Sequence, residues 1–217
     1  MNMKIWYGLQ TKGKERCRLL LIVILVFGFG WQGCATTPPG YQPLAAEGMR
    51  LKYPGYSVVA PPGEGWLIKE NDYGLVAITK KIKSNTHTFF MNVTPVRVTP
   101  NWNSPEDFMT AIKREKDLNV NPKKRLKLLV NDYRLKQDVG EYCFEFHQKA
   151  EDYGVSRTDG APFLILSVKG LGCNHPQERE LYFDVSYSER NKPGEADPEL
   201  EKIGASFLKS FRFENLS

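Results

Sequence analysis

Four side chains in the second half of the chain have the chemistry of a metal site. Cys143 and His147 lie four residues apart and so share one face of a strand, and Cys173 and His175 follow the next apolar run. Two thiolates and two imidazoles are a common tetrahedral ligand set for zinc. These four residues therefore define one candidate function, a carrier of a metal or another ligand.

A disulfide between Cys143 and Cys173 is the competing interpretation, and it is the one we predict. Thiols of exported proteins oxidise readily, and export is what the N-terminal residues of this chain indicate. A hairpin that paired the two cysteines would turn at residue 158, inside a loop over residues 151–161. Free thiols are the third alternative. With the disulfide formed, no metal ligand and no cofactor are expected.

The motifs of common catalytic sites are missing from the sequence. The chain contains no Gly-x-Ser-x-Gly, no His-Glu-x-x-His and no Gly-x-x-x-x-Gly-Lys followed by Ser or Thr. Gly170-Leu-Gly172 begins a dinucleotide-binding pattern that does not continue. The chain has only 3 histidines, and His87, which stands between two threonines, is predicted to be a plain surface residue. We therefore expect no enzymatic activity.

The N-terminal residues have the composition of a targeting segment. Met1–Arg18 is polar and basic, and Leu19–Phe29 is uncharged and almost wholly apolar. A helix that spans a bilayer needs roughly 20 apolar residues. The shorter run found here favours a signal peptide over a permanent membrane helix.

Trp31-Gln-Gly-Cys34 resembles the lipobox of bacterial lipoproteins, in which a small residue precedes the cysteine that receives the lipid. Gly33 fits this pattern, whereas Trp31 stands where the family usually has an aliphatic residue. The resemblance implies a signal peptide over residues 1–33 and acyl chains such as palmitate on Cys34, which anchor the protein to a membrane. Because Ala35 rather than Asp follows the cysteine, the family's sorting rule favours the periplasmic side of the outer membrane over the inner membrane.

The charge of the chain argues against nucleic acid as a partner. The sequence has 30 basic and 25 acidic residues, a formal net charge of +5. Residues 1–33 contain five of the basic residues and one of the acidic residues, which leaves 25 basic and 24 acidic side chains. Domains that bind a duplex usually have a basic stripe that matches the phosphates. The nearly neutral remainder has no such surplus.

Strand patterns dominate the chain beyond a tether that we place over residues 34–50, which is rich in Pro and Gly. Apolar and polar residues alternate, or β-prone residues cluster, over 56–60, 66–69, 73–81, 88–98, 126–131, 142–147, 162–171 and 181–188. Ser104-Pro105 and Asp197-Pro198, each followed by acidic residues, are typical helix starts. We predict one domain over residues 51–217, of the α+β class, in which two helices pack on a mainly antiparallel sheet. The helices are expected on opposite faces or both on one face.

This layout resembles the PsbP-like fold, an α/β sandwich shared by a photosystem II extrinsic subunit, a Ran-binding nuclear-transport factor and small bacterial lipoproteins. The similar features are Tyr53–Val58 with Gly65-Trp66, the helix that starts at Ser104, and a last helix that ends in Phe207–Phe213. The fold hosts binding and assembly factors without catalytic activity. The resemblance therefore implies a membrane-anchored binding or assembly-accessory domain with a protein partner in the cell envelope, and it supplies no site residues.

Two further patterns bear on surface binding. Trp66, Trp102, Tyr53 and Tyr56 would suit a groove for a peptide or glycan, and packing in the core or at its rim is the alternative. The basic run Pro122–Arg125 with Lys127 would suit anionic lipid head groups, and a solvated loop before a strand is the alternative.

Overall fold

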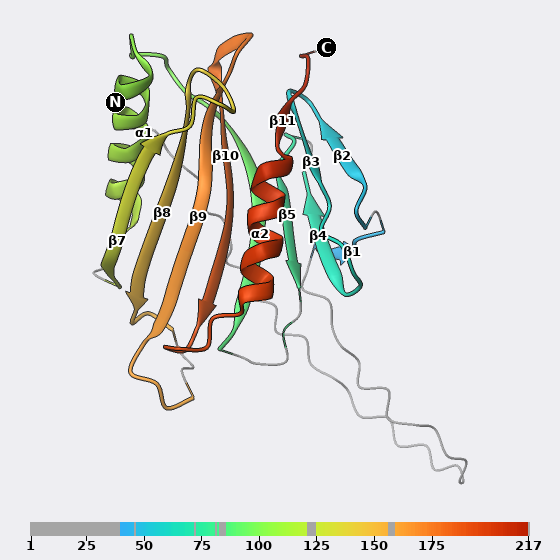
Figure 1. Ribbon diagram of the computed structural model, residues 1–217, viewed down its shortest axis with the longest axis vertical. Coiled ribbons are helices and arrows are strands. Elements are labelled where there is room, and N and C mark those ends of the chain that lie inside the picture. The colour runs from blue at the N-terminus through green and yellow to red at the C-terminus, as the bar shows by residue number, and fades with distance from the viewer. Residues whose placement is uncertain are drawn as a thin grey trace, which may run out of the picture. The chain divides into compact units, whose positions relative to one another are not determined.

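An eight-stranded antiparallel sheet forms the centre of the folded domain (Figure 1). The computed structural model describes residues 40–45, 47–71, 73–80, 82, 86–120, 125–155 and 159–216, which belong to one unit, Thr37–Ser217. The strand order is β1-β4-β5-β6-β10-β9-β8-β7, and a second, three-stranded sheet has the order β11-β3-β2. The predicted α+β class, a mainly antiparallel sheet with two helices, is confirmed.

The elements follow the order that the sequence patterns predict. Their bounds are β1 Gln42–Pro43, β2 Arg50–Tyr53, β3 Tyr56–Val59, β4 Trp66–Glu70, β5 Val76–Lys80, β6 Thr88–Arg97, α1 Pro105–Val120, β7 Leu126–Leu135, β8 Cys143–Asp152, β9 Leu164–His175, β10 Glu178–Asn191, α2 Pro198–Ser210 and β11 Arg212–Phe213. Within the described part of the chain, neither helix has the length and apolar character needed to cross a bilayer.

Both helices begin at the residues expected from the sequence. The Ser104 hydroxyl accepts a hydrogen bond from the Asp107 N–H at 3.1 Å, and the Asp197 carboxylate accepts one from the Glu199 N–H at 2.9 Å. Each side chain satisfies a backbone donor that the first helical turn leaves without a partner. Pro follows both cap residues, at a position where its missing N–H costs nothing.

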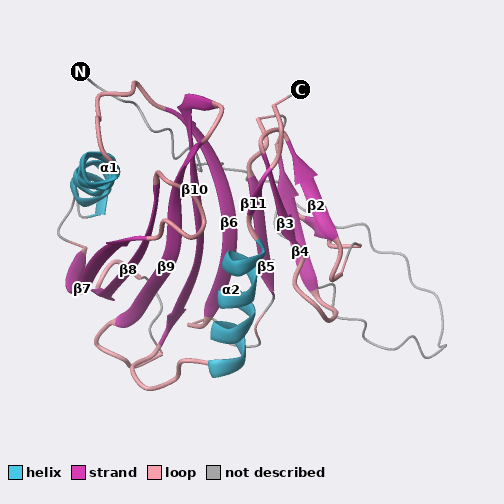
Figure 2. Cartoon of the chain, turned by 45° about the horizontal axis from the view of Figure 1, so that its top comes forward, coloured by secondary structure: helices cyan, strands magenta, loops and turns pink. Residues whose placement is uncertain are grey.

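The two faces of the large sheet carry separate cores, because side chains alternate between faces along a strand. One face packs on α2 and on the three-stranded sheet, through residues that include Tyr56, Ile78, Met91, Phe183 and Phe207. The opposite face packs on α1 through Val98, Trp102, Phe108, Ile112, Phe144, Phe146 and Tyr182. The helices therefore lie on opposite faces, one of the two predicted arrangements, and Figure 2 shows them at separate places along the sheet.

Close packing explains Gly170 and Gly172, which begin a dinucleotide-binding pattern in the sequence but do not complete it. A Cβ atom on Gly172 would lie 2.2 Å from the ring of Phe144, and one on Gly170 would lie 2.5 Å from the ring of Phe146. Both rings lean across β9 beneath α1, and only glycine leaves room for them. Gly170 and Gly172 therefore serve the α1 core and bind no nucleotide phosphate.

The sequence patterns missed three short strands, and one of them corrects the predicted tether. Gln42 pairs with Ile68 of β4, and Leu44 is buried in the core. The folded domain thus begins before residue 51, inside the region assigned to the tether over residues 34–50. Strands of two to four residues have no detectable period, and β1 and β11 form only because distant strands offer them backbone partners.

Candidate functional site

The predicted disulfide is present. Cys143 of β8 and Cys173 of β9 lie directly opposite each other, with their Cα atoms 4.3 Å apart, and their sulfur atoms are bonded. Both residues are fully buried. The same register pairs Asp152 with Leu164, which places the turn of this hairpin where the sequence predicted it.

The four residues of the candidate metal set do not form a site. The disulfide uses both sulfur atoms. His147 Nε2 lies 3.4 Å from Ser167 Oγ, whereas His175 is buried and its Nε2 donates to the carbonyl of Glu214 at 3.1 Å. No group of three or more His, Cys, Asp or Glu side chains among the described residues could hold a metal ion.

The aromatic residues considered for a groove are packing residues instead. Trp66, Trp102 and Tyr56 are buried, and half-buried Tyr53 donates a hydrogen bond to Glu70. Their rings pack against one another or against phenylalanines of the two cores, as Tyr56 does with Phe183 at a centroid distance of 5.2 Å. The structure therefore places no peptide or glycan groove at these four residues.

His87 is also not the surface residue that the sequence suggested. Its Nε2 lies 2.7 Å from the Glu189 carboxylate, and the His87 side chain is only 13% exposed. The same carboxylate accepts a hydrogen bond from the Asp197 N–H at 2.9 Å. Pairing of β6 with β10 brings His87 and Glu189 together across 102 residues, a separation over which local sequence patterns carry no information.

The described part of the basic run has structural partners. Arg125 donates two hydrogen bonds to Asp152, at 2.6 and 2.7 Å, and Lys127 donates one to Glu151 at 3.0 Å. Burial by itself would raise the pKa of Asp152, but hydrogen bonds from Arg125 and the Gly154 N–H, with the nearby charge of Arg190, hold that pKa below its usual value. Residues 121–124, the predicted signal segment and Cys34 lie outside the described residues.

A cleft of about 930 Å³ lies between α2 and the adjoining face of β7, β8 and β9, and we call it the α2 cleft. In Figure 1, α2 lies beside β10 and in front of β6, and β7 and β8 lie farther to the left with no helix or strand in front of them. One strip of the lining is apolar and half-buried or buried: Val139, Leu171, Ala205, Leu208 and Phe213. The volume is within the range of known ligand-binding pockets, roughly 300–1,000 Å³.

Charged side chains surround the apolar strip, and most of them are paired. Arg134 lies 3.4 Å from Glu145, Lys136 lies 3.0 Å from Asp138, and Lys169 pairs with Glu201. Two exposed cations at the end of α2 are different, because among the described residues neither Lys209 nor Arg212 has a carboxylate partner. Arg212 Nη1 donates to the backbone carbonyls of Lys209 and Phe211, so its remaining N–H groups are available to a ligand.

His147 and Ser167 form the only nucleophile–base pair that lines or borders this cleft within the described residues. Burial, followed by the charge of Lys169, lowers the pKa of His147, so the ring is neutral at pH 7. Asp132 is directly opposite His147 on β7 but makes no hydrogen bond to the ring. A catalytic base is normally oriented by such a third group, and this arrangement therefore gives no support to nucleophilic catalysis.

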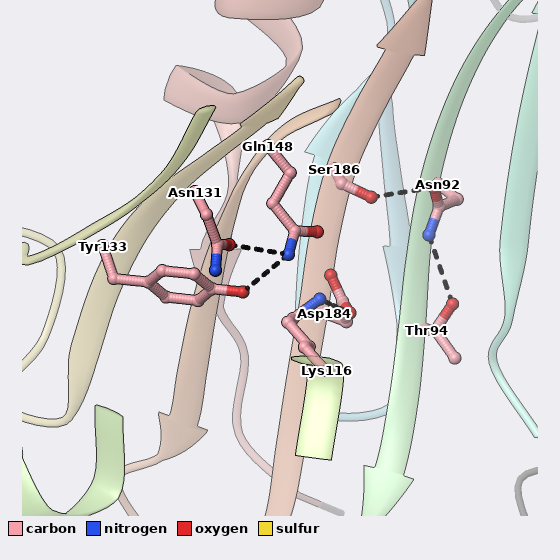
Figure 3. Close-up of polar contacts among 8 residues, drawn as sticks. All are labelled: Asn92, Thr94, Lys116, Asn131, Tyr133, Gln148, Asp184 and Ser186. Atoms are coloured by element: carbon pink, nitrogen blue, oxygen red, sulfur yellow. Dashed lines mark hydrogen bonds and ion pairs between the residues drawn. The ribbon is translucent and has the colours of Figure 1, made fainter. Parts of the chain in front are cut away.

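The opposite face of the large sheet, together with α1, carries a polar belt of eight residues from β6, β7, β8, β10 and α1, shown in Figure 3: Asn92, Thr94, Lys116, Asn131, Tyr133, Gln148, Asp184 and Ser186. Gln148 Nε2 donates to Asn131 at 3.0 Å and to the Tyr133 hydroxyl at 3.1 Å. Ser186 donates to Asn92 at 3.0 Å, and Lys116 of α1 pairs with Asp184. These groups largely satisfy one another, and the pair between Lys116 and Asp184 is the belt contact that joins α1 to the sheet.

Comparison with known proteins does not identify a relative. No protein-family model matches the chain, and no curated protein sequence is significantly similar to it.

No sequence pattern pointed to the α2 cleft. Its lining residues extend from Asp132 to Phe213 along the chain and meet only in the folded sheet. One local signal existed: Asp132, Arg134 and Lys136 alternate along β7, so that a charged row lies on the face that α1 does not cover.

Proposed function

We propose that this protein is a lipoprotein of the bacterial cell envelope whose folded domain binds an envelope component in the α2 cleft and has no catalytic activity. In this proposal Cys34 carries the acyl chains, and the domain faces the periplasm, more favourably from the outer membrane. The domain would be a member of the PsbP-like group of binding and assembly factors.

The α2 cleft is the observation that supports binding most directly. It combines an apolar strip open to solvent with two cations, Lys209 and Arg212, that no described carboxylate neutralises. Pockets that bind ligands are lined in this way, by apolar surface and a few placed polar groups. The lipobox-like residues before Cys34 and the disulfide support an exported protein, since disulfides persist in oxidising compartments.

Site-specific photo-crosslinking in intact cells tests the site. The photoreactive residue p-benzoylphenylalanine is placed at Asp138, which lines the cleft, or at its neighbour Gln137, which is exposed and does not line it. We expect a defined cross-linked product from the Asp138 variant alone. Equal products from both variants, or none from either, would contradict binding in the cleft.

The anchor is tested separately by the intact mass of the protein extracted from its native membrane. We expect the mass of residues 34–217 plus acyl chains, reduced by the two hydrogens of one disulfide. A mass that retains residues 1–33 would show that the proposed cleavage before Cys34 is wrong.

A further inference from the structure

We infer that the α2 cleft binds an anionic amphiphile, a molecule with an alkyl chain and one carboxylate or phosphate group. This inference rests on the proposed binding function and names the ligand class. The alkyl chain would lie along the apolar strip, and the anionic group would lie between Lys209 and Arg212.

The charges around the cleft favour a ligand with one negative group. Three ion pairs neutralise the remaining basic residues of the lining except His147, which is neutral at pH 7. Asp132, the one acid of the lining without an ion-pair partner among the described residues, lies on β7 opposite His147. Lys209 in the last turn of α2 and Arg212 at the start of β11 are three residues apart, so that positive charge gathers where α2 ends.

The walls of the cleft favour an alkyl chain over a peptide or a sugar. β7 is the edge strand of the sheet, but β8 pairs with β7 and β9, and β9, which carries Leu171 of the strip, pairs with β8 and β10, so the backbone of β8 and β9 is bonded on each side. The backbone groups of α2 are bonded within the helix. A buried peptide would need partners for its own N–H and C=O groups, and the strip offers none. An alkyl chain needs no such partners.

Three elements and one loop contribute the apolar strip: Ala205 and Leu208 lie on α2, Phe213 lies on β11, Leu171 lies on β9, and Val139 lies between β7 and β8. Leu208 is half-buried, although it also packs on the core. Part of the apolar side chains of the strip is therefore accessible to an alkyl chain in the cleft.

Photoaffinity labelling of the full-length protein in bilayers of neutral phosphatidylcholine tests the inference. The probes share a diazirine-bearing alkyl chain and differ in the head group: a fatty acid, the matching fatty alcohol, and a phosphatidic acid. We expect labelling by an anionic probe to map to Val139, Leu208 or their neighbours in the cleft. The Lys209→Gln/Arg212→Gln double variant should lose at least about tenfold in labelling, whereas Lys202→Gln, on the exposed side of the same helix, should not change it.

A second variant distinguishes loss of binding from loss of folding, in case the double variant does not fold. Ala205→Leu keeps both cations and a good helix former but fills part of the strip, so it should also reduce labelling severalfold while circular dichroism stays native. Shortening the fatty acid should weaken binding by up to roughly fourfold for each methylene removed. Labelling by the fatty acid alone assigns a free fatty acid as the ligand, and labelling by phosphatidic acid assigns a membrane lipid.

Equal labelling by the fatty alcohol, or undiminished labelling of the double variant, would overturn the inference. A protein cross-linked at Asp138 without labelling by either anionic probe would also overturn it, but would leave the proposed binding function in place. Absence of any product at Asp138 would instead count against the proposed function itself.

Discussion

The polar belt and the α2 cleft occupy opposite faces of the large sheet, where both have residues on β7, β8 and β10, and they differ in how their polar groups are satisfied. Along β8, Gln148 points to the belt and donates two hydrogen bonds to side chains of β7. Its neighbour His147 points to the cleft and has only a 3.4 Å contact with Ser167. A helix covers the first face, and solvent reaches the second.

This difference separates residues that hold the fold from residues that are free to bind. In the belt, Lys116 lies over the ring of Phe146 at 4.1 Å and pairs with Asp184, so the cation is used within the protein. One oxygen, Asp184 Oδ1, is buried without a hydrogen-bond partner in the described structure. In the cleft, Lys209 and Arg212 are exposed beside apolar surface. Polar residues alone thus do not favour binding, whereas unpaired charge beside accessible apolar surface is the feature on which the proposed binding depends.

The largest effect is expected from a cavity on the α1 side. Phe108 is fully buried, and its ring lies 5.0 Å from that of Trp102 and 5.6 Å from that of Phe144. Phe108→Ala should lower the free energy of unfolding by about 3–5 kcal/mol, measured by urea denaturation. Leu208→Ala, in the half-buried strip of the cleft, should cost no more than about 2 kcal/mol. Equal losses would mean that the strip is ordinary core.

The disulfide should contribute nearly as much. Its cysteines are 30 residues apart, and closing a loop of this length stabilises a fold by roughly 3–4 kcal/mol in the chain-entropy model. The Cys143→Ala/Cys173→Ala variant should therefore melt well below the wild type, and reductant should not shift its melting temperature further. An unchanged melting temperature would contradict a structural role for this bond.

A single added methyl group on Gly204 tests how closely α2 packs on β10 beside the cleft. A Cβ atom on Gly204 would lie 2.4 Å from the ring of Tyr187. Gly204→Ala should cost about 1–3 kcal/mol through overpacking, although alanine favours the helix by about 1 kcal/mol. Ser206→Ala, two residues and about 200° around the helix from Gly204 and on its exposed side, should be neutral or slightly stabilising. Stabilisation by Gly204→Ala would show that α2 is free to move away from β10.

The smallest effect should be a pH dependence of the free energy of unfolding that arises from His147 in the cleft. Burial and the charge of Lys169 lower the pKa of His147, so the unfolded chain binds a proton more readily than the folded one. The free energy of unfolding should therefore fall as the pH drops through the ordinary histidine pKa of about 6.5. Above that pH, His147 should add no pH dependence, because its ring is neutral in both the folded and the unfolded chain. His147→Gln should remove that part of the pH dependence, measured by denaturation at several pH values. An unchanged profile would mean that other groups cause it.

Much of the fold was predictable because its strongest elements are local patterns. Leu200, Ile203 and Phe207 recur at helical spacing and form the stripe of α2. The alternation of Phe144 and Phe146 with Glu145 and His147 assigned β8, and the two cysteines then gave the register of β8 with β9, which the structure confirms. The partner of a strand, the face that a helix covers and the strands of two residues were not predictable in this way.

The amino-acid sequence was enough to predict the α+β class, the two helix starts and a disulfide between Cys143 and Cys173. The placement of the helices on opposite faces, the contact of His87 with Glu189 and the meeting of Val139, Leu171 and Leu208 in one strip became visible only in the folded chain. The range of the interactions explains this division. Caps, periodicity and a hairpin register depend on residues close in the chain, whereas a cleft forms from residues far apart in the sequence, where one layer of packing ends.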